Sequence, residues 1–307
     1  MSETIIATGL EFPEGPVCDR DGSVYVVEIR GGRVRKIAAD GTLSVFAQPG
    51  GGPNGAARGP DSALYVTNNG GFAWHDGLPV GPAQDYETGR IERIDTNGTV
   101  RRFYTACDDV RLSAPNDLVF DAEGNFYFTD PIQRDPAVRE PLSAPTKRRG
   151  SVYYATPDGT RIQRVATNLQ HPNGIGLTPD GKTLLVAETF AASLCAFPIR
   201  APGVLGERRP FGSLPKGYYP DGFCLDEEGY VLVGGVLGGG IVVFDPDGKQ
   251  VDLIACADRV VTNVAFGGPN YSTLYITESG LGRVVTHEWP RRGLVLFPTA
   301  LTQNRAG

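Results

Sequence analysis

The sequence predicts an all-β fold, a six-bladed β-propeller built from four-stranded antiparallel blades. The first observation is a motif that occurs six times, in which a proline or a threonine precedes a residue with an oxygen-bearing side chain. The copies begin near residues 12, 52, 114, 171, 219 and 261, so they lie 40 to 62 residues apart, as expected when each repeat forms one blade. The second observation is the composition, since 41 glycines and 24 prolines among 307 residues fit a chain that turns every few residues. We therefore expect residues 1–307 to form a single propeller domain.

The first repeat shows the four strands of a blade most clearly. Residues 15–19, 23–28, 33–38 and 42–47 are short runs, several of them rich in β-branched and aromatic residues. The dipeptides between them are typical of hairpin turns: Asp21-Gly22, Gly31-Gly32 and Asp40-Gly41. Four consecutive antiparallel strands make one blade.

The later repeats follow the same order of inner strand, turn and second strand. The pattern predicts such pairs at residues 116–120 and 126–130, 173–177 and 183–188, and 221–225 and 230–233. Residues 3–8 precede the first motif, and we expect them to supply the outer strand of the last blade. That pairing would remove an open sheet edge.

Each motif places an oxygen-bearing side chain where an inner strand begins. In chain order these residues are Glu14, Asn54, Asn116, Asn173, Asp221 and Asn263. Because the blades are arranged radially, we expect the six side chains to form a ring at one mouth of the central channel. For any single copy, the alternative is that the side chain only bonds turn amides. Hard cations prefer carboxylate and amide oxygens, so the ring predicts one divalent metal ion, Ca²⁺ first, with Mg²⁺, Mn²⁺ or Zn²⁺ as alternatives.

A second set of polar residues is predicted at the same mouth, because each second strand returns to it. These residues are Glu28, Asn68, Asn69, Asp130, Glu188 and Glu278. Two long loops, residues 70–89 and 131–150, start there, and long loops beside a polar mouth are typical of a lid or a specificity wall. Trp74 in the first loop either lines the substrate site or holds the loop in place. We expect Asn69, Trp74 and Asp130 to bind the substrate.

Charge and cysteine content exclude several classes of function. The net charge of −6 and the absence of a basic stripe argue against a nucleic-acid partner. The five cysteines are scattered without a CxxC pair, which predicts buried thiols in a reducing compartment. Residues 1–9 contain no leader pattern, and no apolar run approaches the roughly 20 residues that span a bilayer. We therefore expect a cytoplasmic protein that acts on a small molecule.

Four segments carry a resemblance to a known family: FPEGPV, APNDLVFDAEGNFYFTDP, HPNGIGLTPDG and YPDGFCLDEEG. They are similar to signature stretches of the SMP-30/gluconolactonase family, which is related to the calcium-dependent phosphotriesterases. The resemblance implies a six-bladed propeller with a divalent metal held by Glu14, Asn116, Asn173 and Asp221. It also implies that Asp221 is the catalytic base. Ala114 stands where some sugar-lactone members have an arginine, so the APND segment resembles the microbial lactonase branch more than the animal one.

The chemistry of such a ring fits lactone hydrolysis. A metal can polarise an ester carbonyl and stabilise the oxyanion that forms, while either Asp221 or a metal-bound hydroxide supplies the nucleophile. No GxSxG motif is present, so a Ser-His-Asp hydrolase is poorly supported. The alternatives are the same site acting on another substrate class (phosphotriester hydrolysis, isomerisation or C–C chemistry) and a propeller that serves only as a non-catalytic scaffold.

Overall fold

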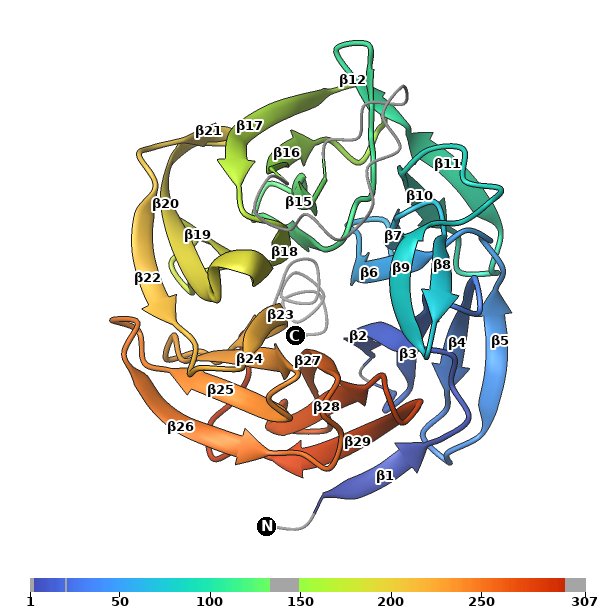
Figure 1. Ribbon diagram of the computed structural model, residues 1–307, viewed down its shortest axis with the longest axis vertical. Helices are drawn as coiled ribbons and strands as arrows, with labels where there is room; N and C mark the ends of the chain where they lie inside the picture. The colour runs from blue at the N-terminus through green and yellow to red at the C-terminus, as the bar shows by residue number, and fades with distance from the viewer. Residues whose placement is uncertain (1–2, 20, 133–148, 296–307) are drawn as a thin grey trace, which may run out of the picture.

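Six four-stranded antiparallel sheets surround one axis in the computed structural model, which describes residues 3–19, 21–132 and 149–295 (Figure 1). The predicted six-bladed propeller is therefore confirmed. Blade 1 consists of β2 (Pro13–Cys18), β3 (Val24–Glu28), β4 (Arg33–Ile37) and β5 (Leu43–Ala47). Blade 2 consists of β6 (Pro53–Arg58), β7 (Leu64–Asn68), β10 (Arg90–Ile94) and β11 (Val100–Tyr104). Blade 3 consists of β14 (Leu118–Phe120), β15 (Phe126–Asp130), β16 (Gly150–Ala155) and β17 (Ile162–Leu169).

The remaining blades repeat this order. Blade 4 consists of β18 (Pro172–Leu177), β19 (Thr183–Glu188), β20 (Ser193–Ala201) and β22 (Arg209–Ser213), with the short β21 (Val204–Leu205) also paired to β20. Blade 5 consists of β23 (Tyr219–Leu225), β24 (Val231–Val236), β25 (Gly240–Phe244) and β26 (Gln250–Ala255). Blade 6 consists of β27 (Val261–Gly267), β28 (Thr273–Glu278), β29 (Arg283–Glu288) and β1 (Thr4–Ala7).

The two ends of the propeller meet in blade 6. β1 pairs antiparallel with β29, with Ile5 opposite Val285, and the side chain of Arg283 donates to Glu3 at 2.8 Å. The predicted closure by residues 3–8 is thus confirmed. The ring has no open radial seam, as a propeller requires.

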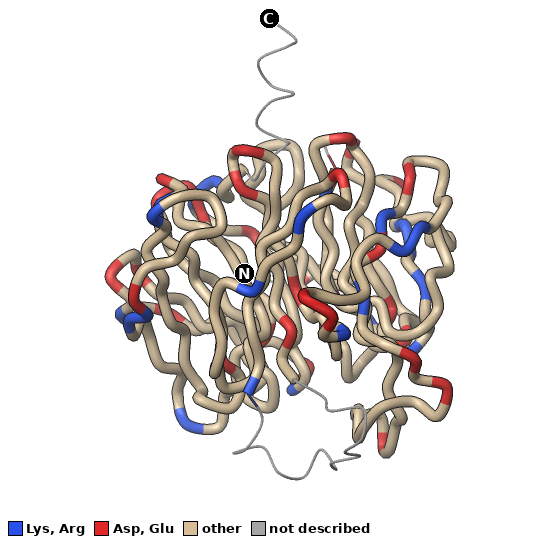
Figure 2. Tube along the Cα trace, turned by 90° about the horizontal axis from the view of Figure 1, so that it is seen from above, with Lys and Arg blue, Asp and Glu red and all other residues tan. Residues whose placement is uncertain are grey.

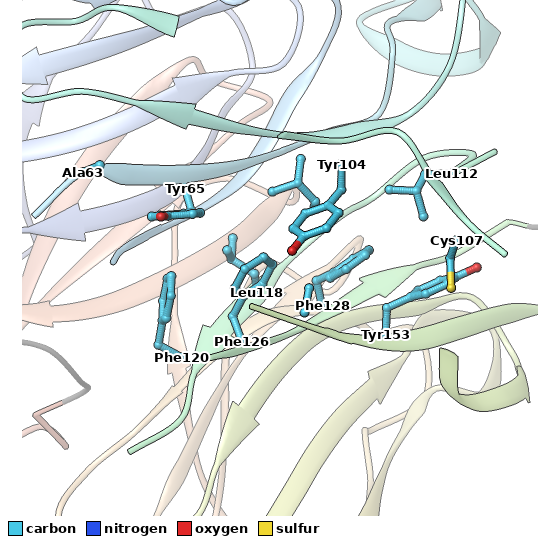
Figure 3. Close-up of a cluster of buried hydrophobic side chains, with 12 residues drawn as sticks. Ala63, Tyr65, Tyr104, Cys107, Leu112, Leu118, Phe120, Phe126, Phe128 and Tyr153 are labelled. Atoms are coloured by element: carbon cyan, nitrogen blue, oxygen red, sulfur yellow. The ribbon is translucent and has the colours of Figure 1, made fainter. Parts of the chain in front are cut away.

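The core is divided into six apolar clusters, one at each contact between neighbouring blades. Figure 3 shows the cluster between blades 2 and 3, where Tyr65 of β7 meets Phe120 and Phe126 edge-on or tilted at ring-centroid distances of 5.2 and 5.7 Å. Alternating β-branched and aromatic residues fill these wedges because both faces of a blade are covered. The packing fixes the inner strands and hence the mouth of the channel.

One of the two predicted long loops contains regular structure. Residues 70–89 contain a hairpin, β8 (Phe72–His75) and β9 (Leu78–Pro82), and the turn between them, Asp76 and Gly77, has φ of 48° and 77°. Asp-Gly between two short strands is a hairpin signal, so the sequence contained this information. Another small hairpin joins β12 (Ala106–Cys107) and β13 (Val110–Arg111), and one 3₁₀ turn, η2, spans Thr189–Ala191. Most of the other predicted loop, residues 133–148, lies outside the described residues.

Among the described residues, neither the surface charge nor the cysteines point to a further site. Figure 2 shows acidic and basic residues interspersed on the side of the propeller that it displays. Cys107 and Cys195 are buried as predicted, whereas Cys18, Cys224 and Cys256 are half-buried, and none forms a disulfide. Within the described part of the chain, no helix has the length and hydrophobicity needed to span a bilayer.

Candidate functional site

Four of the six motif residues, Glu14, Asn54, Asn173 and Asp221, are followed by a glycine that lets neighbouring inner strands approach closely. A Cβ on Gly15 would lie 2.7 Å from the carbonyl oxygen of Asn54, and one on Gly55 would lie 2.6 Å from that of Asn116. Equivalent positions in later blades approach in the same way, Gly174 to Asp221 and Gly222 to Asn263. Glycine removes the side chain that would hold neighbouring inner strands apart.

A hydrogen bond joins the first and last members of the ring. Asn263 Nδ2 donates to Glu14 Oε2 at 2.8 Å, and the Asn173 side chain, whose Nδ2 donates to Thr189 at 3.1 Å, lies beside Asp221. Glu14, Asn54, Asn173 and Asn263 are buried, whereas Asn116 and Asp221 are half-buried. The ring therefore has a buried side and a side that a small molecule can reach.

Three carboxyl groups share this site, and one of them was missed from the sequence. Burial raises the pKa of Glu14 to about 7, against the opposing effect of bonds from Asn263 and the Gly15 amide. Burial and the charge of Glu14 hold the pKa of Asp117 and of Asp221 well above the usual range of an aspartate. The motif pattern selects only the residue after the proline, Asn116, and so misses Asp117, although Asp117 directly follows Asn116 in the sequence. Without a cation, the three groups repel one another when ionised.

The ring residues fit a hard divalent cation. Asn173 Oδ1 is buried and accepts no hydrogen bond. The Asn173 side chain lies beside Asp221, and the carboxyl group of Glu14 is close enough to raise the pKa of Asp221. A buried amide oxygen without a donor is unfavourable, and a cation beside it would satisfy the oxygen and the carboxylates together. Among the described residues, no three Asp, Glu, His or Cys side chains are grouped so that they could hold a metal by themselves. A cation at this ring would therefore need amide oxygens as well as carboxylates.

The second set of polar residues lies at the predicted mouth but is largely used within the fold. In five blades, the residue that ends the second strand accepts a backbone N–H from the segment leading into the inner strand of the same blade: Glu28 from Glu11, Asn68 from Gly52, Asp130 from Ser113 and Ala114, Glu188 from Gln170, and Glu278 from Asp258. Arginines pair with three of these carboxylates. In blade 5 the second strand ends at the apolar Val236.

Asp130 belongs to this group of strand-end residues. Its two carboxylate oxygens accept from the amides of Ser113 and Ala114, each at 2.8 Å. These bonds hold the segment that carries Asn116, so Asp130 positions that segment, and its contact with substrate stays a prediction.

Asn69 and Trp74 remain beside the mouth. Asn69 is fully buried, its Oδ1 accepts from the Gly71 amide at 2.9 Å, and its Nδ2 has no acceptor. Trp74 is half-buried on β8, and its ring lies 5.0 Å from that of Phe12, which precedes Pro13 and Glu14. The hairpin thus places Trp74 beside the first ring residue.

Below the ring, the central channel contains a cavity of about 500 Å³ on the side of the Asp-Gly turns. Asp117 and Asn263 line it beside apolar residues such as Ile175, Phe223 and Val264. The ring therefore separates an apolar channel from the mouth beside Trp74.

Comparisons with known proteins agree with this geometry. The family model described as the SMP-30/Gluconolactonase/LRE-like region matches residues 12–280. Diisopropyl-fluorophosphatase of Loligo vulgaris is 30% identical, over 94% of this chain and 93% of the relative. Gluconolactonase of Zymomonas mobilis is 27% identical, over 90% and 78%. Among solved structures, a gluconolactonase from Xanthomonas campestris is 29% identical with a TM-score of 0.76, over 94% of this chain and 89% of that one.

Proposed function

This chain belongs to the SMP-30/gluconolactonase/LRE-like family, and from that premise we propose that it is a divalent-metal-dependent hydrolase that opens lactones. Relatives named gluconolactonase and lactonase support a hydrolase. The observation that carries the metal dependence is the buried, unbonded Asn173 Oδ1 beside a cluster of raised-pKa carboxyl groups. A non-catalytic scaffold would not explain why the fold keeps a buried amide oxygen without a hydrogen-bond donor beside carboxyl groups that repel one another.

The proposed ligands are Glu14, Asn116, Asn173 and Asp221. Calcium is the proposed ion, because the donors are all oxygens and include no thiolate or imidazole. When bound, such an ion polarises the lactone carbonyl and stabilises the negative charge that develops on its oxygen. Asn263 orients Glu14 through its 2.8 Å bond, and Asp117 adds negative charge next to the ring.

Asp221 is the proposed base. It is half-buried, so one side of the group is reachable from the mouth, and its carboxylate oxygen accepts the proton of the attacking water. Water adds to the carbonyl carbon, the ring C–O bond breaks, and the departing alkoxide takes the proton that Asp221 accepted from water. The product is a hydroxy acid, which ionises at neutral pH and releases one proton per turnover.

Acid release from a panel of aliphatic, aromatic and sugar lactones tests this proposal. We expect turnover in the metal-loaded protein, loss after chelation, recovery with added Ca²⁺, and at least a hundredfold loss in Asp221→Asn. Asp40→Asn is the matched control, because Asp40 is an exposed turn residue of blade 1, and it should retain full activity. Turnover that survives both chelation and Asp221→Asn would contradict the proposal.

The relative named diisopropyl-fluorophosphatase supports a second candidate, hydrolysis of a phosphorus ester or fluoride at the same ring. A fluoride electrode would detect release from a phosphofluoridate. If release requires the same metal and the same Asp221 while every lactone is inert, this candidate replaces the first.

A further inference from the structure

Two aromatic residues at the mouth have a strained backbone. Phe12 and His171 have φ of 61° and 60°, a left-handed conformation that bulky residues rarely adopt. Each directly precedes a proline, which normally favours extended backbone, and each stands two positions before a proposed ligand, Glu14 or Asn173. Backbone bonds from the amides of Ile29 and Thr189 to their carbonyl oxygens, both 3.1 Å, hold the bends. Strain of this kind persists where the surrounding structure requires it, and it concentrates at functional sites.

The side chain that precedes the motif proline or threonine differs in size from blade to blade. In chain order the six residues before the motif proline or threonine are Phe12, Gly52, Ala114, His171, Tyr219 and Val261. The aromatic members belong to blades 1, 4 and 5 and are half-buried or, for Tyr219, 36% exposed, whereas the small members of blades 2 and 3 are buried. Figure 1 shows β2 across the axis from β18, whereas β23 lies beside β18 and β27. Phe12 and His171 thus belong to blades on opposite sides of the axis, and Tyr219 belongs to the blade next to that of His171.

Further aromatic rings extend both sides. The Trp74 ring is tilted against that of Phe12 at a centroid distance of 5.0 Å, and the Arg30 guanidinium lies over the Trp74 ring at 5.8 Å. Phe190 of η2 lies 4.5 Å from His171, next to Thr189, whose hydroxyl accepts from Asn173 Nδ2 at 3.1 Å. Both aromatic groups are therefore fixed to the same backbone that carries the proposed ligands.

We propose that Phe12, Trp74, His171 and Tyr219 form an aromatic clamp for a flat apolar substituent, so that the substrate is an aryl-bearing lactone and not a polyhydroxylated sugar lactone. This inference rests on the proposed function and specifies its substrate class. Flat rings gain both burial and stacking between such walls. A sugar lactone would need a partner for each hydroxyl group that it removes from water. Of the four side chains, Phe12 has no polar atom, and Trp74, His171 and Tyr219 have one or two each.

The kinetic test compares δ-valerolactone, a δ-phenyl derivative of the same ring, and glucono-δ-lactone. We expect kcat/KM of the wild type to be at least tenfold higher for the phenyl lactone than for either other lactone. Trp74→Ala should lower kcat/KM for the phenyl lactone at least tenfold more than for δ-valerolactone, mainly through KM, and Trp74→Phe should restore most of it. Phe211→Leu, in outer strand β22, is the control and should change neither value.

A binding measurement separates failure of the clamp from failure of the reaction. Trp74 is one of only two tryptophans, so the difference in fluorescence between wild type and Trp74→Phe reports on this site. We expect 2-phenylcyclohexanone, which has no ester bond, to quench that difference signal saturably, and cyclohexanone to do so at least tenfold more weakly.

The outcomes are distinct. Saturable quenching without hydrolysis of any lactone would leave the clamp in place and overturn the proposed reaction. Hydrolysis that favours glucono-δ-lactone, with Trp74→Ala affecting all three substrates equally, would overturn the clamp and leave the reaction in place.

Discussion

At the scale of single residues, the site depends on side chains whose hydrogen bonding is incomplete or whose backbone is strained. Asn173 keeps one oxygen without a donor, and Phe12 keeps a left-handed backbone. Neither feature stabilises the metal-free fold. Both are explained if the chain is organised to bind a cation and a substrate at this mouth.

The strain at Phe12 leads to a stability prediction. Phe12→Gly and Phe12→Ala both remove the ring contact with Trp74, but only glycine adopts φ near +61° without steric cost. We expect Phe12→Gly to be more stable than Phe12→Ala by about 1 kcal/mol in the free energy of unfolding, measured by urea denaturation. Equal stability of the two variants would mean that the bend is not strained.

How well single residues could be predicted depends on where their partners lie. Glu14, Asn173 and Asp221 can be singled out as candidates because the motif itself repeats along the chain. The role of Asp130 depends on the amides of Ser113 and Ala114, and those of Glu28 and Glu278 on arginines as well. No repeat in the sequence indicates these partners, so strand-end carboxylates that hold backbone could not be distinguished from carboxylates that bind a ligand.

At the scale of elements, hydroxyl groups on or just after the second strands of four blades donate to the inner strand of the next blade, or to the segment that leads into it. Thr67 donates to the Asn116 carbonyl at 2.5 Å, Thr129 to that of Asn173 at 2.6 Å, Thr189 to that of Pro220 at 2.9 Å and Ser279 to that of Pro13 at 2.5 Å. Each bond ends at a ring residue or at the proline before one. These bonds set the spacing of the proposed ligands.

Thr129→Val tests that role, because valine keeps the shape and removes the hydroxyl. Both the Asn173 carbonyl and the Asp117 amide would lose a buried partner, so we expect a loss of about 1–3 kcal/mol in the free energy of unfolding. Calcium affinity, measured by titration calorimetry, should fall several-fold, and Thr129→Ser should restore both quantities. Thr273→Val removes a hydroxyl at the blade edge and is the control. If it has the same effect as Thr129→Val, the inter-blade bond has no special role.

The strands themselves were predictable to within one or two residues in the first blade, because Asp-Gly turns delimit them. The β8–β9 hairpin was missed although it has the same turn signal, Asp76-Gly77. Its place beside Phe12 follows from an aromatic contact between blades, which strand periodicity does not encode.

At the scale of the whole molecule, six inner strands bring negative charge to one axis, so stability and metal binding are linked through pH. In the metal-free protein the folded-state pKa of Glu14 is about 7, above its ordinary value of 4.5. Between these values the folded state holds a proton that the unfolded state has released, so stability falls as the pH rises through this window. The raised pKa values of Asp117 and Asp221 act in the same direction.

Melting temperatures of chelator-stripped protein at pH 5 and pH 8 test this linkage. We expect the increase in Tm on adding Ca²⁺ to be larger at pH 8, because at pH 5 the ion must displace protons. Glu14→Gln should reduce the difference between the two pH values. Equal increases at both pH values in the wild type would show that the ring carboxyl groups do not bind the ion.

The most direct measurement is a titration of Ca²⁺ into chelator-stripped protein while acid release from a reactive lactone is followed. Our account predicts no turnover at the start, a rise that saturates at one ion per chain, and no rise in Asn173→Ala at the same concentrations. Full turnover before any ion is added, or saturating metal binding that leaves the rate at zero for every lactone and phosphofluoridate, would contradict it.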